Sequence, residues 1–344
     1  MRKNNPYTIM FGREPSQMVS RITQRDEIIN TFTSDVPSSQ IFFITGVRGS
    51  GKTVLMSEIS ARLAAEKKWI TVEISPMGDM LAELASKIYH TGGMSKWLKT
   101  AGIDLSFFGI GMKIKSAEPV TNIEIALRRI LGKLKKEGKR LLITMDEAVS
   151  SKEMRIFASA FQIFMREKLP VFLIMTGLYK NIDVLRNDKV LTFLLRTPRI
   201  NLGSLNIRSM QNYYTETFQL PEEDALEMAH MTKGYPFAFQ VLGYHTYEHH
   251  GDYQKAVEPT RLYLEEYVYE KLWTELSDKE KKICTAIAGT ESGKVLDIRK
   301  KLDIETNEFS PYRANLIKKG ILDGSNYGHI SFTLPFFDDF VRSC

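Results

Sequence analysis

Along the first 205 residues, short apolar runs alternate with longer segments in which apolar residues recur on one helical face. The runs are rich in β-branched and aromatic residues, which is the composition of buried strands. Leu55, Ile59 and Leu63 illustrate the helical spacing. Strands that alternate with helices in this way predict a parallel sheet in an α/β fold.

The same pattern gives the bounds of the predicted elements. Strands are expected at residues 40–45, 69–75, 141–145, 169–177 and around 199–202. Helices are expected at residues 24–33, 55–68, 80–89, 123–134, 152–167 and 188–195. The first 20 residues are expected to be irregular, because glycine and proline interrupt any period there.

A segment between residues 92 and 119 interrupts this alternation. The runs 103–107 and 111–115 are short, partly alternating and separated by a Phe-Gly-Ile turn. This spacing predicts a hairpin insertion. The Phe107-Phe108 pair and the lysines of the second run either contact a partner or belong to an ordinary half-buried hairpin.

After residue 206 the strand signals disappear, and helical patterns predominate up to about residue 269. The helices predicted there form a helical lid, at residues 207–218, 222–231 and 236–249. The tail then has a pattern of its own. Ser277, with Glu280 three residues later, is a capping box that starts a helix.

This tail is predicted to be a winged helix-turn-helix. The capped helix is expected to end at residue 288, and two further helices to cover 295–302 and 310–319. Short strands near 320–322 and 330–332 would complete the wing. Arg313, Lys318 and Lys319 mark its third helix, although acids and bases nearly balance across the whole tail.

Composition narrows the class of protein. The chain has 344 residues, 43% hydrophobic and 26% charged, which describes a globular protein long enough for two or three domains. A net charge of +6 is compatible with polyanion binding, although dispersed Lys and Arg more often form a solvated surface. Cys284 and Cys344 form no disulfide framework or zinc pattern, which favours a reducing compartment. Without a membrane-length apolar run or a signal-peptide core, we expect a cytoplasmic protein and no membrane partner.

Residues 46–53 carry the clearest chemical signal. They fit the phosphate-binding pattern G-x-x-x-x-G-K-[ST], between a predicted strand and a predicted helix. The glycines let the backbone turn tightly, so that successive N–H groups and the positive end of the helix dipole converge on a phosphate. Lys52 adds a charge for the β- and γ-phosphates, and Thr53 offers its hydroxyl to Mg²⁺. The expected nucleotide-binding residues are Gly46, Val47, Arg48, Gly49, Ser50, Gly51, Lys52, Thr53 and Val54.

The second half of the expected site is the acidic end of the run 141–147. A carboxylate at the carboxyl end of a buried parallel strand can reach a Mg²⁺ ion bound with the nucleotide, and Asp146 fits this role. Glu147 is placed to activate the attacking water. The pair favours hydrolysis over phosphate transfer to a metabolite, although the phosphate-binding pattern alone separates neither ATP from GTP nor binding from hydrolysis.

These segments resemble the bacterial and archaeal ATPases of the AAA+ and STAND type, which are related to the replication-origin initiator ATPases. Beyond the loop and the acidic pair, the resemblance spans nearly the whole chain. It rests on Phe11-Gly12 with Pro15, on residues 169–171 leading into 176–178, on Gly234-Tyr235-Pro236-Phe237, on 310–313 and on 328–335.

The resemblance implies a P-loop NTPase sheet in the order 5-1-4-3-2, with ATP and Mg²⁺ as ligands. It implies that Gly234 and Pro236 of the lid lie against the nucleotide. It also implies that the N-terminal leader covers the adenine, which places Arg21 and Arg25 either near the nucleotide or simply on the surface. The lid departs from the family pattern, because Lys233 is the only base near this segment and no obvious sensor arginine is present.

Two further roles concern three residues at or near strand ends. In such ATPases a polar residue at the end of the fourth strand senses the γ-phosphate, so Thr176 is either this sensor or a simple strand-end hydroxyl. Arg196 and Arg199 stand near the sheet edge. Each is either an arginine finger for a neighbouring subunit's nucleotide or part of a surface ion pair.

We therefore expect a P-loop ATPase domain with its leader at residues 1–205, a helical lid at 206–272 and a winged helix at 273–344. The first functional hypothesis is a Mg²⁺-dependent ATPase whose turnover moves the lid and the winged helix. The second is a nucleotide-gated DNA-binding module with slow hydrolysis. The third is a signalling switch whose winged helix contacts protein. ATP and ADP are the expected ligands, and DNA, another protein and further copies of the chain are the alternative partners.

Overall fold

The computed structural model describes residues 4–10, 18–111 and 121–344, which separate into two compact units. The sheet unit comprises Ile22–Thr45 and Lys52–Asn201, and everything else belongs to the lid unit. The lid unit therefore includes Gly46–Gly51 from the phosphate-binding loop. The three-domain division expected from the sequence remains a prediction.

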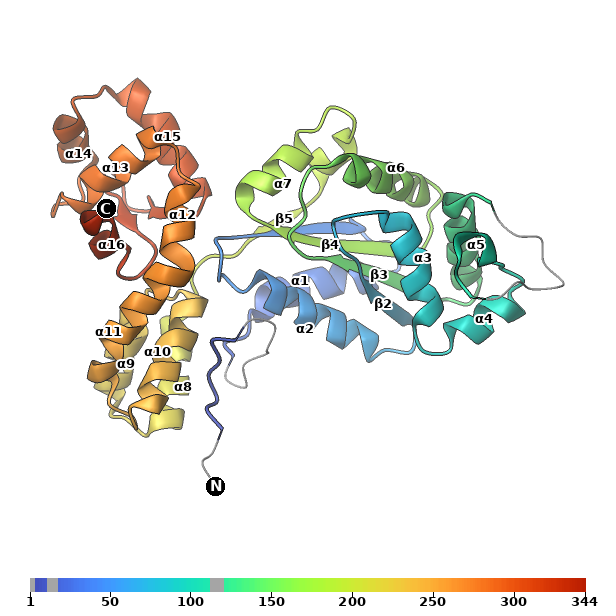
Figure 1. The fold of residues 1–344 in the computed structure, drawn as a ribbon, viewed down its shortest axis with the longest axis horizontal. Coiled ribbons are helices and arrows are strands. Elements are labelled where there is room, and N and C mark those ends of the chain that lie inside the picture. Colours follow the sequence, from blue (N-terminus) through green and yellow to red (C-terminus); the bar gives the residue numbers. More distant parts are fainter. Residues whose placement is uncertain (1–3, 11–17, 112–120) are drawn as a thin grey trace. The chain divides into compact units, whose positions relative to one another are not determined.

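The sheet unit is built on five parallel strands (Figure 1). They are β1 (Ile41–Thr45), β2 (Trp69–Glu73), β3 (Arg140–Met145), β4 (Val171–Gly177) and β5 (Arg199–Asn201). Their order is β2-β3-β4-β1-β5, which confirms the order 5-1-4-3-2. Every residue of β1 and β4 is buried, as expected for strands covered on both faces.

Helices cover both faces of the sheet (Figure 1). On one face lie α1 (Ile22–Thr33) and α2 (Lys52–Ala64), and Phe32 of α1 packs against the rings of Phe42 and Phe172. The other face shares one apolar core with alternate strand residues. Its helices are α3 (Met80–His90), α5 (Ile123–Lys136), α6 (Lys152–Arg166) and α7 (Tyr179–Arg186).

The segment expected to form a hairpin begins with helix α4 (Met94–Thr100), which the sequence analysis did not anticipate. A 3-10 turn, η1 (Ser106–Phe108), occupies the end of the first expected strand. Met94 and Leu98 are buried four residues apart on one helical face, and this packing explains the helix. Most of the second expected strand, at 111–115, lies outside the described residues.

The helix expected at 188–195 is also wrong. Helix α7 ends before it, and only the 3-10 turn η2 (Thr192–Arg196) follows. The Asp188 carboxylate accepts a hydrogen bond from the Val190 N–H at 2.9 Å. This bond stabilises a local turn in competition with a helix.

The lid consists of successive helices in the lid unit. They are α8 (Ile207–Phe218), α9 (Glu222–Met231), α10 (Pro236–Glu248), α11 (Tyr253–Leu264), a π-helical turn η3 (Glu265–Tyr269) and α12 (Glu270–Thr274). The three lid helices expected from the sequence are confirmed. Among the described residues, no helix combines the length and apolar character needed to cross a membrane.

The C-terminal module has the predicted winged helix-turn-helix elements. They are α13 (Asp278–Ala288), α14 (Val295–Leu302), α15 (Thr306–Lys318), β6 (Leu322–Asp323), β7 (Ser331–Phe332) and a further helix, α16 (Phe337–Ser343). The capping box of Ser277 and Glu280 is confirmed. Helix α15 begins before the expected residue 310, and the sequence analysis did not anticipate α16.

A buried carboxylate holds the end of α15 inside this module. Glu280 accepts hydrogen bonds from Lys319 Nζ at 2.6 Å and from Asn315 Nδ2 at 2.8 Å. Burial raises the pKa of Glu280, but the hydrogen bonds from Lys319 and Ser277 outweigh burial and lower it overall. Lys319 is therefore engaged within the module.

Tyr7 fixes the N-terminal segment to the lid. It is only 1% exposed, and its ring packs against the rings of Tyr214, Phe218 and Phe239. Gly243, in the middle of α10, leaves room for this ring, because a Cβ there would lie 2.5 Å from it. Glycine inside a helix costs about 1 kcal/mol relative to alanine. Here the space taken by Tyr7 accounts for the glycine.

We predict that Gly243→Ala lowers the melting temperature, because the new methyl group would overlap the Tyr7 ring. Such overpacking costs roughly 1–3 kcal/mol, more than the helix-propensity gain of about 1 kcal/mol. Gly132→Ala in α5 is the matched control, since no atom lies within 4 Å of the Cβ position at Gly132. Thermal unfolding should show Gly132→Ala stabilised. A Gly243→Ala variant of equal stability would contradict the packing.

Candidate functional site

Three predicted site residues of the sheet unit come from three elements at one sheet edge: the metal-ligand candidates Thr53 and Asp146, and the sensor candidate Thr176. Strands β1, β3 and β4 end together, as their parallel register requires. Asp146 directly follows β3, and Thr176 is the penultimate residue of β4. Thr53 lies in the first turn of α2. The carboxyl-edge position predicted for Asp146 is where the structure has it.

Two threonine hydroxyls hold the carboxylate of Asp146. Thr53 Oγ1 donates to Asp146 Oδ2 at 2.8 Å. Thr176 Oγ1 donates to the other oxygen, Oδ1, and Thr176 is fully buried. Both carboxylate oxygens are thus fixed, one from α2 and one from β4. Thr176, expected to sense the γ-phosphate, here orients Asp146, and its contact with a phosphate stays a prediction.

These oxygen atoms suit Mg²⁺, which prefers carboxylate and hydroxyl oxygens and usually keeps phosphate and water ligands as well. Within the described ranges, no group of three or more His, Cys, Asp or Glu side chains is arranged to hold a metal ion. A metal at Thr53 and Asp146 would therefore draw its other ligands from a bound nucleotide and from water.

Glu147 has an unusual backbone. Its φ of 52° lies in the left-handed region that residues other than glycine rarely adopt. Its N–H donates to Asp146 Oδ1 at 3.0 Å and to Thr176 Oγ1 at 3.2 Å, which offsets the strain. The side chain is exposed, and no described residue forms a hydrogen bond or ion pair with its carboxylate. This carboxylate is therefore accessible to solvent.

The loop at 46–51 follows a path that its glycines permit. Gly49 and Gly51 have φ values of 73° and 84°. A Cβ on Gly46 would lie 2.4 Å from Ser50 Oγ, and the Ser50 N–H donates to the Val47 carbonyl at 3.2 Å. Ser50 is 2% exposed, and its hydroxyl has no hydrogen-bond partner in the described part of the chain. A narrow backbone turn with an unpaired buried hydroxyl fits a phosphate cradle.

Lys52, Thr53 and Val54 form the first turn of α2 in the sheet unit. Lys52 is 9% exposed, Thr53 is exposed and Val54 is half-buried. The partial positive charge at a helix N-terminus favours an anion, and Lys52 adds a full charge there. These features fit the polyphosphate of a nucleotide with Mg²⁺.

The lid residues Gly234 and Pro236 have structural reasons for their identity. Gly234 has a φ of 73°, and a Cβ there would lie 2.8 Å from the Leu205 carbonyl oxygen. Pro236 is the first residue of α10, where its fixed φ suits a helix start. Their contact with a nucleotide remains a prediction.

Two neighbouring segments contact the loop within the lid unit. Arg21 donates to the Ser50 carbonyl at 3.2 Å and to the Gly203 carbonyl at 2.6 Å, and burial lowers its pKa to about 10. Val47 Cγ1 lies 3.0 Å from where a Cβ on Gly320 would be, in the C-terminal module. Of the two leader arginines considered above, Arg21 therefore forms a hydrogen bond with the loop. The other, Arg25, lies in the sheet unit and donates a hydrogen bond to the Glu58 carboxylate of α2 at 2.6 Å.

The two arginine-finger candidates differ in their surroundings. The guanidinium of Arg199 stacks 4.4 Å from the ring centroid of Tyr179 and lies 3.9 Å from Asp183 Oδ1. Arg196 ends η2, is exposed and forms no hydrogen bond or ion pair with the described residues. Arg199 is engaged within its own unit, so Arg196 is the better candidate.

Sequence reasoning missed one residue that contacts the loop. The Tyr235 hydroxyl donates to the Arg48 carbonyl at 2.6 Å. The position between Gly234 and Pro236 was noted as a family-like segment, but only its neighbours were considered. The sequence did offer a signal: Tyr235 lies between a glycine that favours a turn and a proline that starts a helix.

Three solved structures share this fold at low sequence identity. A Walker-type ATPase of Pyrococcus abyssi is 15% identical, covers 97% of this chain and 99% of its own, and has a TM-score of 0.69. The ORC2 protein of Aeropyrum pernix, solved as ADPNP–ADP complexes, is 14% identical over 97% of both chains, with a TM-score of 0.60. Cdc6p of Pyrobaculum aerophilum is 14% identical over 97% of both chains, with a TM-score of 0.50.

Sequence comparison adds little to this. Residues 266–341 match a family model described as a domain of unknown function, DUF8462. No curated protein matches the chain. The structural likeness concerns the fold, and at this level the predicted resemblance is confirmed: the chain is similar to AAA+ ATPases of the origin-initiator kind.

Proposed function

We propose that this chain binds ATP with Mg²⁺ and hydrolyses it. The observation that carries the proposal is the Asp146 carboxylate, which is held through both oxygens by Thr53 and Thr176. A turn whose only role was structural would not require a buried threonine to orient a half-exposed carboxylate. The loop and the first turn of α2 supply the matching phosphate ligands.

Each residue then has a defined task. The loop N–H groups bind the β-phosphate, and Lys52 binds the β- and γ-phosphates. Thr53 and Asp146 hold Mg²⁺, which neutralises charge on the phosphates when it is bound. Glu147 accepts a proton from water as the water oxygen attacks the γ-phosphorus, and the bond to the ADP oxygen breaks. Thr176 positions Asp146 and the turn at Glu147.

We further propose that nucleotide state is coupled to the lid and the winged helix. Residues 46–51 group with the lid helices and the C-terminal module rather than with the sheet. A change in this loop on binding phosphate would therefore act first on the lid unit. The division into domains at residues 205 and 272, a cytoplasmic location and assembly into homo-oligomers are parts of the same proposal.

Substitutions in the two halves of the site are expected to affect different steps, ATP binding in one case and turnover in the other. Lys52→Ala should weaken ATP binding by roughly 10- to 100-fold, because a charged phosphate ligand is lost. Glu147→Gln should bind ATP normally but turn over roughly 10²- to 10⁴-fold more slowly, because only proton acceptance is removed. Calorimetric titration and a phosphate-release assay on both variants measure the difference. Normal turnover in Glu147→Gln would remove that residue from the mechanism.

If neighbouring subunits share the site, Arg196→Ala should reduce hydrolysis by roughly 10³-fold or more while leaving ATP affinity nearly unchanged. Activity per subunit in the wild type should also rise with protein concentration. Arg199→Ala is the comparison, since that side chain already contacts Tyr179 and Asp183. Turnover that stays constant on dilution would indicate a monomer that hydrolyses ATP unaided.

A signalling switch whose winged helix contacts protein is the second candidate function, and α15 favours it over DNA binding. The third helix of such modules enters the DNA groove. Lys319 is bonded to Glu280, and Arg313 is half-buried and donates to the Gly324 carbonyl at 3.5 Å. Among the three basic residues expected to mark this helix, Lys318 is the exposed one.

We therefore expect the wild type to bind duplex DNA weakly and with little dependence on salt. Fluorescence anisotropy between about 50 and 200 mM salt measures this dependence. Lys319→Ala should destabilise the module, since Glu280 loses its cation, whereas Lys318→Ala should change stability by about 0.5 kcal/mol or less. A steep salt slope that Lys318→Ala reduces by about one unit would instead support DNA binding.

A further inference from the structure

The apex of the phosphate-binding loop is in contact with the lid through Tyr235. This residue is the N-cap of α10, is 4% exposed and belongs to the lid unit together with the loop. Its hydroxyl donates to the Arg48 carbonyl at 2.6 Å. A tyrosine buried to this degree normally requires a partner for its hydroxyl, and here the partner is loop backbone.

The lid also covers Gly49, the next residue of the loop. A Cβ on Gly49 would lie 2.3 Å from Tyr235 Oη and 2.8 Å from Phe237 Cβ. Gly49 also needs its left-handed φ of 73°. The close approach of two lid residues is thus a second reason for glycine at this position of the loop.

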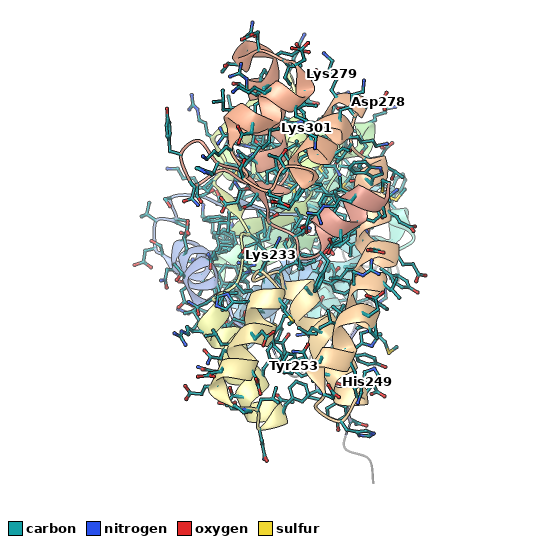
Figure 2. All side chains as sticks on the ribbon, turned by 90° about the vertical axis from the view of Figure 1, so that its left-hand side faces the viewer. Lys233, His249, Tyr253, Asp278, Lys279 and Lys301 are labelled. Carbon is teal, nitrogen blue, oxygen red and sulfur yellow. The ribbon has the colours of Figure 1, made fainter. Side chains whose placement is uncertain are left out.

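The position of Tyr235 is itself set by the lid and the C-terminal module. The Gly234 N–H donates to Thr232 Oγ1 at 3.1 Å, and the Gly234 carbonyl accepts from the Leu205 N–H at 2.8 Å. Lys233, labelled in Figure 2, reaches the Phe332 carbonyl of the wing at 3.4 Å. A shift of the lid against this module would therefore move Tyr235.

The peptide between Arg48 and Gly49 carries this effect into the loop. A trans peptide is planar, so its C=O and N–H point in opposite directions. The hydrogen bond from Tyr235 fixes the Arg48 carbonyl toward the lid, and consequently it turns the Gly49 N–H to the other side. That N–H is one of the loop donors assigned to phosphate.

We propose that Tyr235 is a positioning residue through which the lid regulates nucleotide affinity, by holding the loop backbone rather than by touching the nucleotide. This inference rests on the proposed function. The cradle serves phosphates common to ATP and ADP, so both nucleotides are affected alike. Glu147 and the Mg²⁺ ligands are left unchanged, so the lid tunes KM and leaves kcat as it is.

Tyr235→Phe in the full-length chain tests this, because it removes the hydroxyl and keeps the ring. Tyr214→Phe is the matched control: its hydroxyl also donates to a backbone carbonyl, that of Phe239 at 2.9 Å, and it is fully buried within the lid. Titration calorimetry with ADP and with Mg²⁺-ATP, steady-state kinetics and thermal unfolding are measured for each.

We expect Tyr235→Phe to weaken the binding of ADP and of ATP by the same factor, roughly 3- to 10-fold. KM should rise by the same factor, and kcat should stay unchanged. Tyr214→Phe should lose similar thermal stability and keep wild-type affinities. If Tyr235→Phe does not fold, a fluorinated tyrosine is placed at this position instead. Its more acidic hydroxyl is a stronger donor, so the affinity for both nucleotides should increase.

The outcomes separate this inference from the proposed function. A wild type that binds neither nucleotide would overturn both. A wild type that binds them, with Tyr235→Phe unaltered, would overturn only the inference. If Tyr235→Phe weakened the binding of ATP but not of ADP, the lid would contact the γ-phosphate. Equal weakening in both phenylalanine variants would mean general loosening of the lid. Either result excludes an effect through the loop backbone.

Discussion

The carboxylate of Asp146 accepts a hydrogen bond on each oxygen, and the geometry of the proposed site depends on this arrangement. The donors come from the first turn of α2 and from the end of β4, while Asp146 follows β3. Hydrogen bonds to an ionised group are about twice as strong as neutral ones. Asp146 Oδ1 and Thr176 Oγ1 also accept hydrogen bonds from the N–H of Glu147, and these contacts stabilise its left-handed backbone.

A second constraint is that one loop serves two compact units. Lys52 and Thr53 belong to the sheet unit, whereas residues 46–51 belong to the lid unit. Within the lid unit, the loop bonds Tyr235 and Arg21, and Val47 lies beside Gly320 of the C-terminal module. In the proposed function, residues of both parts of the loop are assigned to phosphate. This division gives a physical reason for coupling nucleotide state to the lid, without any ligand contact from the lid.

The strands and most helices were predicted from the residues, because strands buried on both faces appear as apolar runs and helices show apolar residues at the helical period. The sheet order came from the resemblance to the AAA+ and STAND ATPases. Sequence reasoning also placed Asp146 correctly, since parallel strands end at one edge. It failed where tertiary contacts decide. Lys319 was grouped with Arg313 and Lys318, and its bond to Glu280 was missed because Glu280 is distant in sequence. The bond from Thr176 to Asp146 was not predicted, because it cannot be inferred from spacing, and the sensor role of Thr176 stays a prediction. Local side-chain bonding at Asp188 overrode the helix expected there, and the packing of Met94 and Leu98 adds helix α4, which was not predicted.

The central claim is that Asp146, held by two threonines, binds a metal that arrives with the nucleotide. Mn²⁺, a paramagnetic substitute for Mg²⁺, allows this to be measured by electron paramagnetic resonance on the full chain with and without ADP. The account predicts firm Mn²⁺ binding only with ADP, weakened by roughly 10-fold or more in Asp146→Asn, because the charged ligand is lost. Mn²⁺ binding that is unchanged in Asp146→Asn, or that ignores ADP, would contradict it.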